Sequence, residues 1–145
     1  MKKYLVVLSA LFVTPFIMGM GIGGGNVTHR IPVPDKNFSA TIVDSQGVTT
    51  KVTQISFDGK TYLAGQRGNT NVTIPFDKIS SVQVGTPAEE KKLSALITLK
   101  DGKTLNIKVD GSLPCYGSAD FGNVQVEFKD IRKVDIHGIV PKETQ

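Results

Sequence analysis

A duplicated stretch constrains this chain more than any other feature, because residues 58–84 reappear without a gap as residues 110–136, 52 positions later. Eight of the 27 aligned pairs are identical, whereas ordinary residue usage gives about two. The repeated residues suit turns or a buried face, and none has the surroundings of a nucleophile, a base or a metal ligand. The repeat therefore predicts duplicated packing and not a duplicated active site. The identical pairs are Asp58/Asp110, Gly59/Gly111, Gly65/Gly117, Asn71/Asn123, Val72/Val124, Phe76/Phe128, Ile79/Ile131 and Val82/Val134.

Apolar residues alternate with polar ones on both sides of several turn signals. Phe38, Ala40 and Ile42 share one face ahead of the turn signal at 44–47, and the second copy alternates in the same way over 95–109. An Asp-Gly pair between two alternating runs favours a hairpin, because glycine accepts the positive φ of such a turn. We therefore expect hairpins at 44–47, at Asp58-Gly59, at 100–103 and at Asp110-Gly111.

The repeated block changes its period partway along. Val72, Ile74 and Phe76 alternate as a strand does, and the next apolar residues, Ile79 and Val82, follow at steps of three. A strand, a tight helical turn over residues 77–78 and a last short strand keep all of these side chains on one buried face. Since Pro75 cannot donate to a ladder, we expect its strand to lie at a sheet edge.

The N-terminus has the pattern of an export signal. Lys2 and Lys3 precede a 17-residue, mostly apolar run over 4–20, followed by glycines at the spacing of a cleavage site. We predict a signal peptide that is cleaved near residues 21–25. The alternative is an uncleaved membrane anchor, because the run is at the lower limit of what spans a bilayer. A membrane is a partner only in that second case.

About 120 residues then remain, enough for a modest core. The prediction is an all-β protein of two tandem small antiparallel β units, barrel- or sandwich-like, after the signal peptide. The linker between the units has room for one helical turn. The predicted layout is signal peptide 1–24, flexible Gly/Pro-rich tether 25–37, β repeat 1 at 38–84, linker 85–92, β repeat 2 at 93–136 and tail 137–145.

The second copy also resembles a known type of unit. Residues 97–103 contain an Asp-Gly hairpin signal, and residues 121–134 contain a Phe-Gly turn, a short strand and an I-x-x-V ending. This arrangement resembles a unit of bacterial cell-envelope proteins of unassigned role and is similar in strand order to small Sm-like barrels. The first copy departs from it, with residues 67–70 in place of Phe-Gly. The resemblance implies the periplasm or cell envelope and assigns no activity.

Charge excludes one class of partner. The net charge of +4 includes Lys2 and Lys3, so the exported part is near +2 and has no basic stripe. We therefore expect no nucleic acid as a partner. One alternative remains open, a weak binder of acidic polymers or lipid surfaces, provided that the basic residues converge on one face. These residues are Lys91, Lys92, Lys129, Arg132 and Lys133.

The reactive residue types are few and scattered. His29 and His137 have no partner at metal-ligand spacing, so we expect no metal, no cofactor and no catalytic residue. Cys115 stands alone and aligns with Leu63 of the first copy, which favours a buried hydrophobe. Two alternatives remain, an exposed thiol that forms an intermolecular disulfide and a thiol enzyme in which His137 lies near Cys115.

Together these features predict an exported, non-enzymatic binding or structural module. Its expected means of action is the sheet itself, because each β unit can leave a strand edge open. The expected partner is a protein, or a second copy of the chain, that pairs with such an edge.

Overall fold

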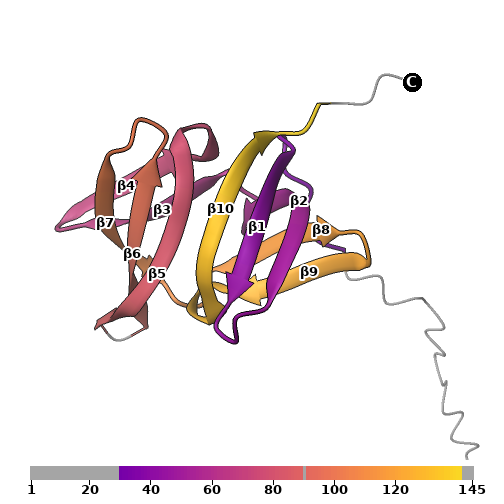
Figure 1. Cartoon of the computed structure of the whole chain (residues 1–145). Coiled ribbons are helices and arrows are strands. Elements are labelled where there is room, and N and C mark those ends of the chain that lie inside the picture. Colours follow the sequence, from indigo (N-terminus) through magenta and orange to yellow (C-terminus); the bar gives the residue numbers. More distant parts are fainter. Residues whose placement is uncertain (1–29, 90, 142–145) are drawn as a thin grey trace, which may run out of the picture.

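The computed structural model describes residues 30–89 and 91–141. One continuous antiparallel sheet of ten strands curls around a single hydrophobic core (Figure 1). Apart from two 3-10 turns, η1 (Phe76–Lys78) and η2 (Phe128–Asp130), these two ranges contain no helix, which confirms the all-β prediction. The strands are β1 (Phe38–Asp44), β2 (Thr49–Phe57), β3 (Tyr62–Arg67), β4 (Thr70–Pro75), β5 (Ile79–Glu89), β6 (Lys92–Leu99), β7 (Thr104–Asp110), β8 (Pro114–Ala119), β9 (Gly122–Glu127) and β10 (Ile131–Ile139).

The strand order interleaves the two halves of the chain. It runs β4-β3-β7-β6-β5-β10-β1-β2-β8-β9, so the hairpin β3–β4 continues the sheet from β7 and the hairpin β8–β9 continues it from β2. The order is symmetric about the β5–β10 pair. Strands whose numbers differ by five, such as β4 and β9 or β3 and β8, lie at equal distances on either side of this pair. The separate units expected at 38–84 and 93–136 are therefore not separate sheets. The β2–β3 and β7–β8 connections carry each hairpin to the other end of the sheet.

The Asp-Gly signals predict turns better than they predict pairing. The signals at 44–47 and 100–103 close the β1–β2 and β6–β7 hairpins, as expected. Asp58 and Gly59 also form a tight turn with φ of 52° and 82°, but the chain makes only one bridge, Phe57 to Lys60, before β3 diverges from β2. The expected hairpin is therefore wrong here, and it is also wrong at Asp110-Gly111, because β8 pairs with β2 and β9 and not with β7. Strand β8 takes the place beside β2 that β3 was expected to fill.

The predicted linker over 85–92 is mostly strand. Strand β5 continues to Glu89 and β6 begins at Lys92, and the two pair across register shifts beside Pro87. The helical turn considered for this segment is absent from its described residues. Lys91 lies between the strands with φ of 67°, a conformation that few residues other than glycine adopt. The predicted linker is therefore part of a two-strand ladder that reaches the pair Glu89 and Lys92.

The apolar residues of the repeated block form the core as predicted. Phe76 and Phe128 are fully buried at the start of η1 and η2, and the tight turn expected over 77–78 is confirmed. Phe57 packs edge-to-face on both rings, at centroid distances of 5.7 and 6.0 Å, and Phe38 packs on Phe76 at 5.5 Å. These rings come from both halves of the chain, so the halves share one core.

The expected leader at 1–24 lies outside the described residues, as do the start of the tether and the end of the tail. In the part that is described, no helix has the length and apolar character needed to cross a membrane. The described part of the tether packs on the sheet, since Pro32 lies against Gly59 in the β2–β3 turn.

Candidate functional site

The sheet has two open edges, formed by strands β4 and β9 at the ends of the strand order. Phe76 donates its backbone N–H to Thr61 O at 2.9 Å, and this bond fixes which residues of β4 direct their peptide groups toward β3 and which direct them outward. Because neighbours along an antiparallel strand point their peptide groups to opposite sides, Thr73 directs its N–H and C=O away from β3. In β9, the bond of 2.8 Å from Phe128 N–H to Leu113 O fixes the same pattern, so Gln125 directs its N–H and C=O away from β8. The edge position predicted from Pro75 is thus confirmed.

The composition of these edge strands suits pairing. Natural edges are usually protected by charged side chains, by proline or by bulges. Strand β4 has no charged residue and carries its proline at the last position, Pro75, whereas β9 has its charge at the last position, Glu127. The middle of each strand is β-branched or amide-bearing, with exposed Thr73 and Gln125. Both strands therefore present an uncharged segment of several residues.

A lysine-lined groove lies beside the β5–β6 turn. It has a volume of about 530 Å³ and is bordered by Lys91, Lys92 and Lys129, with apolar surface from Pro87 and Leu93. Backbone hydrogen bonds join its walls: Gly111 N–H donates to Lys91 O at 2.8 Å, and Lys129 N–H donates to Gly111 O at 2.9 Å. Three of the five basic residues singled out in the sequence thus line one groove.

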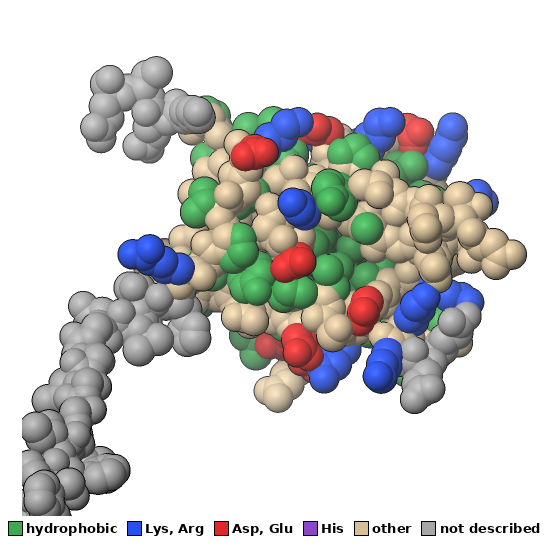
Figure 2. All heavy atoms as spheres, turned by 180° about the vertical axis from the view of Figure 1, so that it is seen from behind, with side chains coloured by type: hydrophobic (Ala, Val, Ile, Leu, Met, Phe, Trp, Pro, Cys, Tyr) green, Lys and Arg blue, Asp and Glu red, His purple; other side chains and the backbone are tan. Residues whose placement is uncertain are grey.

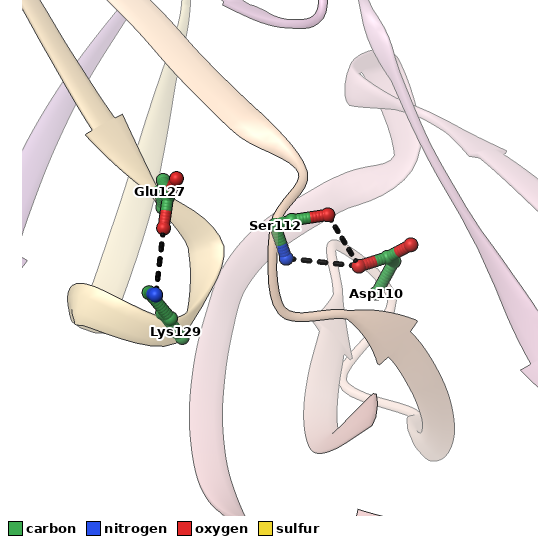
Figure 3. A network of polar contacts seen from close by, with 4 residues as sticks. All are labelled: Asp110, Ser112, Glu127 and Lys129. Carbon is green, nitrogen blue, oxygen red and sulfur yellow. Dashed lines mark hydrogen bonds and ion pairs between the residues drawn. The ribbon is translucent and has the colours of Figure 1, made fainter. Parts of the chain in front are cut away.

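Acidic groups compensate much of the positive charge at this groove (Figure 3). Lys129 lies 3.0 Å from Glu127, and hydrogen bonding to that carboxylate raises the lysine pKa. Ser112 donates both its backbone N–H and its hydroxyl to Asp110, at 2.9 and 2.7 Å, and these bonds, the backbone one first, lower the pKa of Asp110. The groove is therefore a mixed-charge surface. On the face shown in Figure 2, cationic and anionic side chains likewise alternate around a central group of hydrophobic ones.

The other two basic residues lie among different neighbours. Arg132 reaches Ser45 O at 3.4 Å beside the β1–β2 turn. Lys133 lies in β10, opposite Gln83 and 3.4 Å from Asp135. The five basic residues therefore do not share one groove.

Cys115 is a buried hydrophobe. Its side chain is fully shielded in β8, opposite Phe57 and Val126, and burial raises the pKa of the thiol to about 12. A reactive thiol needs access and a stabilised thiolate, and this position has neither. An intermolecular disulfide would require β8 to leave the sheet. The position therefore matches that of Leu63 in the first copy, which is also fully buried.

We expect burial of this thiol to make stability depend on pH. Above pH 9.0 the thiol of the unfolded chain ionises, whereas the folded thiol stays neutral up to about pH 12. Ionisation therefore stabilises the unfolded state relative to the folded state, and the unfolding free energy falls by about 1.4 kcal/mol per pH unit in this window. Cys115→Val lacks this contribution, so the gap between the two unfolding free energies should change between pH 8 and pH 10.5. Parallel pH profiles would contradict the prediction.

A second groove crosses strands β10, β1, β2 and β8. Its volume is about 520 Å³, and hydroxyl groups line it together with Lys51, Asp120 and His137. His137 Nε2 lies 2.7 Å from Thr41 Oγ1, and Cys115 is absent from the lining, so the pairing of Cys115 with His137 considered above is not formed. The sequence held no signal for this groove, because the β1–β10 and β2–β8 pairs join strands that are distant in the chain. Within 30–89 and 91–141, no group of three or more potential metal ligands exists.

Comparisons with known proteins place the chain in a family. A protein-family model with the description "Uncharacterised protein" matches residues 34–138. The chain is also similar to an uncharacterised protein of Aquifex aeolicus, with 23% identity over 129 residues, 88% of this chain and 92% of that protein. No solved structure matches. These matches provide no link to Sm-like barrels or to the cell envelope.

Proposed function

The chain belongs to the "Uncharacterised protein" family, whose model matches residues 34–138, and we propose that it is an exported, non-enzymatic binding module of the bacterial cell envelope. In this role it captures an extended segment of a partner protein along β4 or β9. The observation that carries the proposal is the pair of open edges at the two ends of the sheet, each with an uncharged central segment. Strand addition to an edge provides affinity through main-chain hydrogen bonds and specificity through side-chain pockets.

Three further features support this role. The basic n-region and apolar run at 2–20 have the pattern of an export signal, which supports an envelope location. The single thiol is buried, as a packing residue of the sheet would be. The repeated residues 58–84 and 110–136 are mainly core and turn residues, which is what a scaffold for two equivalent edges requires. The two tandem units expected from the sequence are thus, in this proposal, two copies of one edge-bearing segment.

A photo-crosslinking experiment tests the edges. A photoreactive amino acid replaces Thr73 on β4 in one variant, Gln125 on β9 in a second, and Gln83 on β5 in a control. All three side chains are exposed, so we expect melting temperatures within a few degrees of the wild type. Irradiation of intact cells should give a discrete protein adduct at position 73 or 125 and at least about tenfold less at 83, because Gln83 in β5 is paired with Lys133 of β10 and with Leu96 of β6. Equal yields at all three positions, or no adduct at either edge, would refute the proposal.

A further inference from the structure

The two open edges of the sheet are chemically alike, and we propose that β4 and β9 bind the same class of partner, an amphipathic β-strand segment. Each such segment alternates apolar and polar residues and directs its apolar side chains toward the core. One chain therefore holds two segments, one at each edge. This inference rests on the proposed function of the edges and adds the residue pattern of the partner and the number of segments bound.

Strands β4 and β9 are corresponding parts of the repeat. Residues 70–75 align with residues 122–127, and both strands have asparagine followed by valine at their second and third positions. Thr73 and Gln125 occupy equivalent positions with outward-directed peptide groups, because the bonds of Phe76 and Phe128 fix the same pattern in both strands. The two strands lie at opposite ends of the sheet (Figure 1), so a strand added at one end leaves the other end unchanged.

At each edge the core ends in valines that are only partly covered. Val72 in β4 is half-buried and packs against the core, as are Val124 and Val126 in β9. The register partners of the β9 valines on the inner strand, Gly117 and Cys115, are buried. A strand added to either edge places every second side chain beside these valines. Apolar side chains at those positions continue the core and remove the valines from water.

The opposite face of each edge strand is polar and uncharged in its middle. Asn71 and Thr73 are exposed on this face of β4, and Asn123 and Gln125 are exposed on the same face of β9. The remaining side chains of an added strand lie beside these groups and stay in contact with water. Polar side chains suit that position, and no charge on the edge requires a countercharge. The edges thus fit a strand with one apolar face and one polar face.

The residue pattern of the partner is tested by photo-crosslinking from positions 73 and 125 of the full chain in intact cells. Protease digestion and mass spectrometry of the adducts should locate both crosslinks in segments with an apolar residue at every second position over about five residues or more. An adduct at one position only, or in a helical or uniformly polar segment, overturns this inference and leaves capture by a single edge standing. No adduct at either position refutes the proposed function and this inference together.

The number of bound segments is tested with the purified exported chain and a synthetic peptide of the crosslinked segment. Native mass spectrometry should show two peptides per chain. Thr73→Pro and Gln125→Pro each remove an outward N–H and no bond within the sheet, as Pro75 does two positions along β4, so each variant should bind one peptide and the double variant none. The controls Thr73→Ser and Gln125→Ser keep the N–H and should bind two. One peptide per wild-type chain would overturn the proposal, whatever the stability of the proline variants.

Discussion

Phe57→Ala should lower the unfolding free energy by about 3–5 kcal/mol, the range for truncating a buried phenylalanine. Phe57 is 2% exposed and packs edge-to-face on Phe76 at the start of η1 and on Phe128 at the start of η2. The alanine variant therefore leaves a cavity and loses two ring contacts, each worth about 0.5–1.5 kcal/mol of that total. Since small domains are stable by about 5–15 kcal/mol, this loss removes a large part of the stability.

Phe121→Ala is the matched control for this measurement. Phe121 lies in the β8–β9 turn and is 76% exposed, so the same truncation there should change the unfolding free energy by no more than about 0.5 kcal/mol. Urea unfolding of both variants, followed by far-ultraviolet circular dichroism, gives the two values. A loss in Phe57→Ala no larger than that in Phe121→Ala would show that the three rings do not form the centre of the core.

The local pattern was sufficient to predict the strands, the tight turn after Pro75 and the buried residues of the repeated block. Period-two alternation and turn residues are properties of neighbouring positions, and a single sequence displays them directly. The partner of each strand is a property of distant positions. The Asp58-Gly59 turn forms as its residues require. Strand β3 nevertheless pairs with β4 and β7, and β2 pairs with β8 in its place. Turn chemistry sets the chain reversal and does not decide which strand fills the adjacent place.

The candidate site was predictable to a similar extent. Pro75 identified the edge at β4, because a missing backbone donor is visible in the sequence. The buried state of Cys115 followed from its alignment with Leu63. The groove that contains His137 had no such signal, since its lining comes from four strands that the interleaved order brings together. The ladder that reaches Glu89 and Lys92 was also missed, because the apparent linker at 85–92 has the composition of a loop.

Gly65→Ala should lower the unfolding free energy by about 1–3 kcal/mol, the range for overpacking a core. A Cβ at Gly65 would lie 2.7 Å from Lys108 O and 2.9 Å from Ile107 Cδ1, at the crossing where β3 meets β7 through one register pair, Gln66 with Lys108. The lower entropy of the unfolded alanine variant offsets about 0.4–1 kcal/mol of the loss.

Two further variants identify the cause of this loss. Ile107→Val removes the contact with Cδ1 but leaves the Cγ atom, 3.3 Å away in isoleucine, and the backbone carbonyl of Lys108, so the double variant Gly65→Ala/Ile107→Val should stay destabilised. In the control Gly85→Ala the nearest atom, Ser94 O, is 3.3 Å away, and the change should be smaller. Thermal unfolding ranks the three variants, and hydrogen exchange of the β3–β4 amides should be fastest in those that carry alanine at position 65. Full recovery in the double variant would show that Ile107, and not the backbone of β7, limits the space at this crossing.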